Sequence, residues 1–433
     1  MRSRFLYLVH AVYLYVFCCL SACNDEKNDV ITITCRAKGI EMTLCRELVQ
    51  IWSKKHGVDV EIIALPNASG DCFSLYQQLL HIGSSDVDVY QIDSVWGSAF
   101  AEHFLDLSEY VEPNYLQNFF EPIADTLHHN GRLIALPLYT DVGIMYYRRD
   151  LLEKYNLPRP TTMEELYETA LKIQTAERVH NPNMYGFVFH AKAQESLTCF
   201  ALELISAFRG KVIADDRLCL TDFESVEAMR FIALCMRNIV PRSVLNYSEE
   251  ETRGIFQSGN AVFMRNWPYA WALLNSEKSP LCGKVEVMSI PPSRHHGKTT
   301  GALGGWHMSV SKYSKNPQKA ISLVKFLTSR YSQKVRALRA SYAPTYIDLY
   351  SDIEIRIQNS FFKTLALSLR NAAIRPSRYV RNYNLASAVI YNNVHNILAH
   401  KVEAEDGMDQ CEQELRPLLV SGSHFAKSSY VHK

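Results

Sequence analysis

The sequence has almost no excess of charge of either sign, and it lacks the short motifs that mark several large enzyme classes. Lys and Arg number 46 against 45 Asp and Glu, a formal net charge of +1, and no basic block stands out. This balance gives no electrostatic reason to expect binding to nucleic acid or another polyanion. The chain contains no GxSxG, HExxH, Walker A or GxGxxG pattern. None of the activities that those motifs mark is therefore indicated.

Cysteine is present, but never at the spacing of a metal site. The chain has 11 Cys, and none of those at 35, 45, 72, 199, 219, 235, 282 and 411 forms a CxxC pair. The adjacent His residues at 128–129 and 295–296 have no carboxylate at ligand spacing. We predict no metal and no cofactor. One or two disulfides can form in an exported chain, and the other thiols are expected to be buried as apolar side chains.

Long hydrophobic runs are missing except at the N-terminus, where FLYLVHAVYLYVFCCL follows the basic MRSR. This run is somewhat short for a membrane span, which needs about 20 residues, and it is typical of a signal peptide. The next letters, LSAC, resemble a bacterial lipobox. We predict a signal peptide over 1–22, lipidation of Cys23, and a tether over 23–30. An uncleaved signal anchor and simple secretion are the alternatives.

The rest of the chain is globular and too long for one ordinary core, because it has 433 residues with 47% hydrophobic and 21% charged residues. Strand-like VITITCRA, VDVEIIAL and VDVYQID alternate with an amphipathic helix that ends at Gly57 and with a second helix over about 72–82. Such alternation predicts βαβ units and a largely parallel sheet. The fold class is therefore α/β.

Start signals locate several later elements. Thr161 and Thr162 each precede a Glu by three residues, as in a capping box, and Ser248 is a helix N-cap candidate. AVFMRN is expected to be a strand, and a short strand begins near Trp306. NPQKAISLVKFLTSRYSQKVRAL is expected to form one helix with Asn316 as its cap.

Tyr139 and Asp141 suggest a binding site, because they precede the nearly uncharged run VGIMYY. If residues 138–146 are extended, the two side chains project to the same side. An aromatic ring beside a carboxylate suits a sugar, whose C–H face stacks on the ring while its hydroxyls donate to the acid. A turn or capping role for Asp141 is the alternative.

Aromatic and glycine residues elsewhere fit the same kind of site. Trp267 and Tyr269 flank Pro268 at a strand-to-helix turn, and Gly304 and Gly305 precede another Trp. Glycines let the backbone approach a ligand closely. The simpler interpretations are a core aromatic cluster and a tight bend. A glycosidase would need a pair of carboxylates, and the sequence offers Asp93 and Asp141 without further support.

Taken in order, the segments DVDVYQIDSVW, ALPLYTDVGIMYYRRDLLEKYNLP, GNAVFMRNWPYAWALLN, GALGGWHMSVSKYS and AAIRPSRY resemble the extracellular solute-binding proteins of bacterial ABC importers. The resemblance is strongest to the trehalose/maltose-binding branch of the maltose-binding-protein family, and it extends from about residue 31 to about 415. It implies a two-lobed, hinged, periplasmic-binding-protein-like fold (type II) with a ligand cleft between the lobes. Each lobe would be a mostly parallel sheet flanked by helices, with 31–137 and 292–342 in the N-terminal lobe and 138–291 and 343–433 in the C-terminal lobe.

Matched position by position, the resemblance implies a set of sugar-binding residues: Glu41, Asp93, Tyr139, Asp141, Trp267, Tyr269, Gly305, Trp306 and Arg375. The acids would accept hydrogen bonds from sugar hydroxyls, and the rings would stack on the sugar. The chain departs from the family in the helix of the first lobe, where disaccharide binders place an arginine. DCFSLYQQLL has no basic residue there, which leaves the choice between trehalose, maltose and another glycan open.

The implied protein is a monomeric, lipid-anchored receptor on the outer side of the bacterial membrane. It would perform no catalysis, and it would deliver a small sugar, such as an α-linked disaccharide, to a permease pair driven by an ATPase. Its partners would be the sugar, the permease and the membrane, without nucleic acid. The alternatives are a glycoside-modifying enzyme, a binder of a different small solute, and a scaffold lipoprotein that has lost its pocket.

Overall fold

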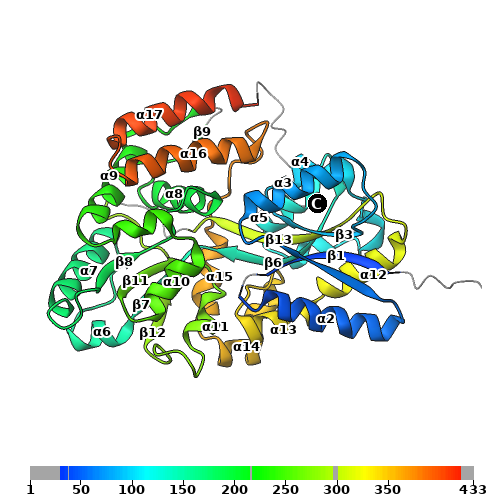
Figure 1. Ribbon diagram of the computed structural model, residues 1–433, viewed down its shortest axis with the longest axis horizontal. Coiled ribbons are helices and arrows are strands. Elements are labelled where there is room, and N and C mark those ends of the chain that lie inside the picture. The colour runs from blue at the N-terminus through cyan, green and yellow to red at the C-terminus, as the bar shows by residue number, and fades with distance from the viewer. Residues whose placement is uncertain (1–29, 38, 215–216, 296–300, 421–433) are drawn as a thin grey trace, which may run out of the picture.

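The computed structural model describes residues 30–37, 39–214, 217–295 and 301–420. The predicted signal peptide, Cys23 and all of the tether but its last residue lie outside these ranges. Within them the elements build two α/β units side by side, each around its own sheet (Figure 1). Two strands, β6 and β13, run through the middle of the molecule between the units. This arrangement confirms the predicted fold class.

The first sheet has five strands in the order β2-β1-β3-β13-β6. Its strands are β1 (Ile31–Arg36), β2 (Val60–Leu65), β3 (Val89–Asp93), β6 (Leu136–Val142) and β13 (Leu303–Val310). Its flanking helices are α2 (Glu41–His56), α3 (Ser69–His81), α4 (Gly97–Phe100), α5 (Glu121–Ala124), α12 (Pro317–Leu327) and α13 (Arg330–Ala340). In Figure 1, α3 and α4 lie on one side of this sheet, and α2 and α12 lie on the other.

The second sheet has four strands in the order β12-β7-β11-β8. Its strands are β7 (Ile144–Arg148), β8 (Tyr185–Val188), β11 (Ala261–Asn266) and β12 (Val285–Met288). The helices around it are α6 (Arg149–Lys154), α7 (Met163–Glu177), α8 (Glu195–Ala207), α9 (Phe223–Asn238), α10 (Glu249–Gln257), α11 (Ala270–Leu274), α14 (Ile353–Gln358), α15 (Phe362–Arg370), α16 (Tyr383–Leu398) and α17 (Ala404–Leu415). Two short hairpins complete the fold: β4 (His128–His129) with β5 (Arg132–Leu133), and β9 (Ile213–Ala214) with β10 (Arg217–Leu218).

Strand direction is the point on which the structure corrects the sequence prediction. The pairs β1–β2, β1–β3 and β8–β11 are parallel, as βαβ units require. The pairs β3–β13, β6–β13, β7–β11 and β7–β12 are antiparallel. Both sheets are therefore mixed rather than mostly parallel. The reason is connectivity, because strands that arrive from the other unit enter a sheet without a preceding crossover helix.

Local signals placed most elements correctly, with one wrong prediction. Helix α2 ends where Gly57 adopts the left-handed conformation, and Ser248 forms a full capping box at α10. The single helix expected from Pro317 onward is instead two helices, α12 and α13. The break occurs because Ser329 caps a new helix by accepting a hydrogen bond from the backbone N–H of Ser332.

The chain crosses between the sheets at strand ends. β6 belongs to the first sheet as far as Val142, and β7 begins in the second sheet at Ile144. The return crossing lies between β12 and β13. The predicted division into lobes, 31–137 with 292–342 and 138–291 with 343–433, stays a prediction.

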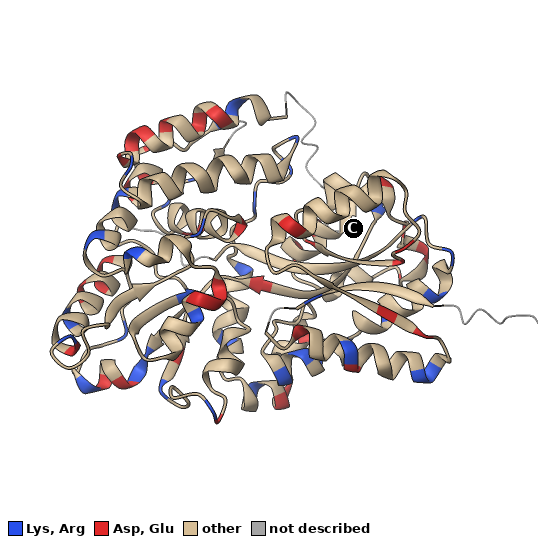
Figure 2. Cartoon of the chain, viewed as in Figure 1, with Lys and Arg blue, Asp and Glu red and all other residues tan. Residues whose placement is uncertain are grey.

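Charged residues are interspersed over most of the outer helices, and acidic ones predominate on α17 (Figure 2). No helix in the described ranges is both long and apolar enough to cross a bilayer. Within those ranges no group of three or more His, Cys, Asp or Glu is placed to hold a metal ion.

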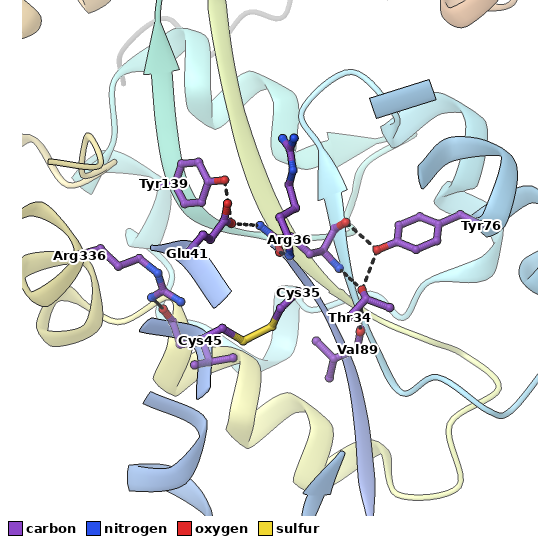
Figure 3. Close-up of a disulfide and its surroundings, with 11 residues drawn as sticks. Thr34, Cys35, Arg36, Glu41, Cys45, Tyr76, Val89, Tyr139 and Arg336 are labelled. Carbon is purple, nitrogen blue, oxygen red and sulfur yellow. Dashed lines mark hydrogen bonds between the residues drawn. A yellow bond between two sulfur atoms is a disulfide. The ribbon is translucent and has the colours of Figure 1, made fainter. Parts of the chain in front are cut away.

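A disulfide joins the end of the first strand to the first helix. Cys35 and Cys45, ten residues apart, form this bond, and both are buried (Figure 3). Of the six free thiols in the described chain, Cys282 alone is exposed. The sequence allowed one or two disulfides but did not indicate which residues pair. The disulfide closes a loop that contains Arg36 and Glu41.

Replacing Cys35 by Ser is expected to lower the free energy of unfolding by about 2–3 kcal/mol, because a cross-link over a loop of this length restricts the unfolded chain by about that amount. Urea unfolding with and without dithiothreitol measures the loss. Cys282→Ser is the matched control and should unfold like the wild type. Equal stability of the Cys35→Ser variant and the oxidised wild type would contradict the prediction.

Candidate functional site

A cavity of about 80 Å³ lies between the two units, and it collects the predicted site residues. All nine line its wall: Glu41, Asp93, Tyr139, Asp141, Trp267, Tyr269, Gly305, Trp306 and Arg375. They come from six separate stretches of the chain. The structure therefore brings together in space what the sequence places far apart.

The alternation of side chains along a strand explains why Tyr139 and Asp141 face the same side of β6. Both lie on β6 two residues apart, so both side chains project to one side and reach the cavity. On the neighbouring strand β13, Trp306 is opposite Tyr139 and Gly304 is opposite Asp141. An aromatic pair and a carboxylate thus share one wall of the cavity.

Gly305 fills a position that other residues cannot adopt without strain. Its φ is +143°, and a Cβ at this residue would come within 2.9 Å of the Tyr139 carbonyl oxygen. A Cβ on the preceding Gly304 would lie 3.8 Å from the Trp267 ring. The two glycines therefore keep β13 close to β6 and leave the space beside the Trp267 ring open.

Glu41 is buried in a small polar network at the N-terminus of α2 (Figure 3). Its side chain accepts hydrogen bonds from the Tyr139 hydroxyl at 2.8 Å and from Gln91 Nε2 at 2.5 Å. Burial raises the pKa of the Glu41 carboxyl, although Arg36 and these hydrogen bonds oppose the shift. The network holds the Tyr139 ring against the cavity.

Arg375 joins segments that are far apart in the chain. Its Nη2 donates to Asp93 at 2.6 Å and to Ser94 at 2.8 Å, and its Nη1 donates to Glu195 at 3.0 Å. Burial raises the pKa of Glu195, while the charge of Arg375 opposes that shift. The guanidinium therefore links the end of β3 in the first unit to the start of α8 in the second.

Trp267 and Tyr269 occupy the turn between β11 and α11, as the sequence predicted. The guanidinium of Arg265 lies 3.9 Å from the centre of the Trp267 ring, and the Tyr146 hydroxyl donates to the Trp267 carbonyl at 2.8 Å. The Tyr269 hydroxyl donates to Glu250 at 2.6 Å. Trp267 is thus held by the buried Arg265 and Tyr146, and Tyr269 is held by the partly exposed Glu250.

Several cavity residues were missed in the sequence. They are Arg36, Asn67, Ala68, Ser69, Gln194, Glu195, Ser196, Cys199, Glu249 and Tyr342, while Gly304 was singled out only as part of the glycine pair. Arg36 could have been predicted as a cavity residue, because it ends a parallel strand just as Asp93 does. Glu195 and Glu249 start helices, but nothing in the local sequence tells which helix starts face a cavity.

The composition of the wall determines what it can bind. Among the described lining residues are the carboxylates of Glu41, Asp93, Asp141, Glu195 and Glu249 and the guanidiniums of Arg36 and Arg375. Five aromatic rings, those of Tyr139, Trp267, Tyr269, Trp306 and Tyr342, are interspersed with them. Acceptor-rich carboxylates between flat apolar rings suit a neutral polyhydroxy compound and disfavour an anion.

Comparisons with known proteins agree with this geometry. The family model for bacterial extracellular solute-binding proteins matches residues 41–334. A probable ABC transporter-binding protein of Deinococcus radiodurans is 38% identical over 407 residues, which cover 93% of this chain and 96% of that protein.

Solved structures share the fold. The maltose-bound MalE3 of T. maritima superposes with a TM-score of 0.85 at 35% identity, covering 89% of this chain and 99% of that one. An ABC transporter solute-binding protein of Agrobacterium vitis with bound D-mannitol superposes with a TM-score of 0.77 at 19% identity, over 90% of this chain and 98% of that one. The second likeness concerns the fold alone.

Proposed function

The chain belongs to the family of bacterial extracellular solute-binding proteins, and from this premise we propose that it captures a small neutral sugar for an ABC importer. The ligand we propose is an α-linked disaccharide such as maltose or trehalose, bound in the cavity between the two units. The observation that carries the proposal is the wall of five carboxylates and five aromatic rings around one cavity. The MalE3 structure, 35% identical, contains maltose and supports the same ligand class.

The family is one of non-enzymatic binding proteins of ABC transporters, which removes the alternative of a glycoside-modifying enzyme. In the proposed cycle, the sugar binds between the two units and stabilises their closed arrangement, and the closed form docks on the permease. This is a shift of population between conformations rather than chemistry. Rings would stack on the C–H faces of the sugar, and the carboxylates would accept its hydroxyl protons.

Each predicted site residue keeps a defined role in this proposal. Asp93 and Asp141 accept hydrogen bonds from sugar hydroxyls, and Trp267 and Trp306 stack on the sugar rings. Tyr139 contacts the sugar with the edge or the face of its ring. Glu41, Tyr269, Gly305 and Arg375 shape the wall and hold its acids. The lobe limits given above define the two halves that close.

Calorimetric titration tests the function. The full chain is purified in a detergent without a sugar headgroup, stripped of bound ligand by unfolding and refolding, and titrated with trehalose, maltose, sucrose, glucose, galactose and mannitol. One-to-one binding of a disaccharide at micromolar or lower Kd would support the proposal and name the ligand. Binding of mannitol alone would replace the disaccharide by a polyol, and a folded protein that binds none of the panel would contradict a sugar-binding function.

We also propose that the protein is anchored by lipid on Cys23, because LSAC follows the apolar run and the family is extracellular. Cys23→Ser is expected to move the protein from the membrane fraction to the soluble fraction of fractionated cells. Substitution of the nearby Cys18, within the apolar run, is the control and should leave the protein in the membrane. A Cys23→Ser protein that stays membrane-bound would mean that the apolar run itself is the anchor.

A further inference from the structure

The cavity contains two guanidiniums, and one of them has its donors engaged by the protein. Arg375 donates from Nε to the Leu303 carbonyl at 3.1 Å, from Nη1 to Glu195, and from Nη2 to both Asp93 and Ser94. An arginine has five N–H donors. At least four hydrogen bonds from Arg375 therefore go to protein groups, and little of its donor capacity is left for a ligand.

Arg36, in contrast, makes few side-chain hydrogen bonds to the described part of the protein. It is 8% exposed and lines the cavity, and its Nε has no hydrogen-bond partner in the described part of the chain. Its one hydrogen bond from the side chain to a described residue runs from Nη2 to the Asn67 carbonyl at 3.0 Å. A buried N–H without an acceptor is costly. The Arg36 side chain therefore has N–H donors at the cavity that can form hydrogen bonds to an acceptor on a ligand.

The position of Arg36 is set by rigid neighbours rather than by a loop. It ends β1, its backbone N–H donates to the Gln91 side chain at 2.8 Å, and the residue before it, Cys35, is bonded to Cys45. The guanidinium lies 4.1 Å from the centre of the Trp306 ring. In Figure 3 the side chain extends away from the disulfide. A planar donor group is therefore held in a fixed orientation on an aromatic face.

Helix α3, which lies next to this wall, contributes no basic side chain to the cavity lining. In α3, Phe73 is buried against Trp96 and Phe100, and the Ser74 hydroxyl donates back to the Gly70 carbonyl. Neither residue is among those that line the cavity. The chain lacks an arginine in α3, but Arg36 on β1 places a guanidinium in the cavity instead.

The charge around Arg36 argues against an anionic ligand. Burial alone lowers the pKa of Arg36, but the neighbouring acidic groups, with Glu41 and Glu249 among them, together outweigh burial and raise it, so the group stays protonated. Carboxylates on the same wall already balance the charge. A carboxylate or phosphate on the ligand would be repelled by that acidic lining, whereas a neutral hydroxyl or ring oxygen can accept from the open donors without this repulsion.

We propose that Arg36 is a specificity-determining residue, whose free N–H groups donate to neighbouring oxygen atoms of the bound neutral sugar while its plane stays stacked on Trp306. This inference rests on the proposed function and deepens it. The ligand must present at least one acceptor oxygen, and preferably two on adjacent ring carbons, at this wall. Lys cannot replace Arg here, because an ammonium is not a planar fork.

The experiment titrates the full chain, in the detergent used above, with the disaccharide that binds best and with its monodeoxy analogues. Arg36→Ala is expected to lower the affinity about 10- to 100-fold, as for the loss of a charged donor, and Arg36→Lys at least about tenfold. Arg148→Ala is the matched control, since Arg148 is also 8% exposed and lies outside the cavity lining. It should bind the sugar like the wild type.

The analogues separate recognition from a structural role. For an analogue that lacks a hydroxyl contacted by Arg36, the difference in affinity between the wild type and Arg36→Lys should shrink, whereas the other analogues keep the full difference. A loss of the same size for every analogue, or no loss in either Arg36 variant, would overturn the inference while leaving the proposed function intact. A wild-type protein that binds no sugar would overturn the proposed function, and this inference with it.

Discussion

Replacing Asp141 by Ala is expected to reduce sugar affinity at least about a hundredfold while the protein stays folded. Asp141 lies on β6 beside Tyr139, opposite Gly304, and its carboxylate is part of the cavity wall. A carboxylate that accepts from two sugar hydroxyls makes two charge-assisted hydrogen bonds, each worth about 1.5–3 kcal/mol. The loss of two such bonds corresponds to a factor of a hundred or more in Kd. Calorimetric titration against the best-binding sugar measures it.

The stability of Asp141→Ala should fall little, because the side chain is only partly buried at the edge of the cavity. Thermal unfolding without sugar checks this, and unfolding with sugar should show a much smaller ligand-induced rise in Tm than in the wild type. Asp106→Ala, at an exposed aspartate outside the cavity, is the control and should keep the full affinity. Unchanged affinity in Asp141→Ala would remove this residue from the binding site.

Many of the cavity residues could be predicted from the sequence, because the regular geometry of a strand determines which side each of its residues faces. Alternation along β6 predicts that Tyr139 and Asp141 share a side, and the structure confirms this. The ends of parallel strands are where ligands gather in α/β folds, and Asp93, which the resemblance implied as a site residue, lies at the end of β3. The same rule points to Arg36 at the end of β1, but a basic residue there did not fit the expected pattern of acids and rings.

What sequence reasoning missed depends on contacts between distant segments. The pairing of Cys35 with Cys45 is one of many pairings that the thiols allow, and only the fold brings these two together. Glu195 enters the cavity because Arg375, 180 residues later in the chain, bonds to it. Strand direction in the mixed sheets likewise follows from where β6 and β13 cross between the units, which no local pattern encodes.

The split between α12 and α13 shows a different limit. The apolar spacing of 317–338 suits one long helix, and a Ser inside a helix is ordinarily tolerated. The break exists because Ser329 caps the second helix and the Ser332 hydroxyl donates to the Phe326 carbonyl at 2.7 Å. A cap inside an apolar pattern is ambiguous in sequence, and packing of α13 against α2 and α11 accompanies the break.

Replacing Glu203 by Ala is expected to cause the largest loss of stability, about 3–5 kcal/mol, because it leaves a buried guanidinium without its counter-charge. Glu203 and Arg265 have fully buried side chains. Glu203 Oε2 accepts from Arg265 Nε at 2.7 Å, Oε1 accepts from Arg265 Nη2, and Oε1 also accepts from the backbone N–H of Ala302 at 3.0 Å. The carboxylate therefore ties α8 and β11 to the segment that returns to the first sheet. Urea unfolding measures the loss.

Two further variants identify the cause of that loss. The double variant Glu203→Met with Arg265→Met should be more stable than Glu203→Ala, since it buries no unpaired charge. Glu168→Ala is the control, because Glu168 forms an ion pair with Arg294 that is more than half exposed on both sides, and its loss should stay below about 1 kcal/mol. A loss as small as this in Glu203→Ala would mean that the buried pair does not hold the crossing segment. Sugar affinity should also fall in the double variant, because Arg265 supports the Trp267 ring from the protein side.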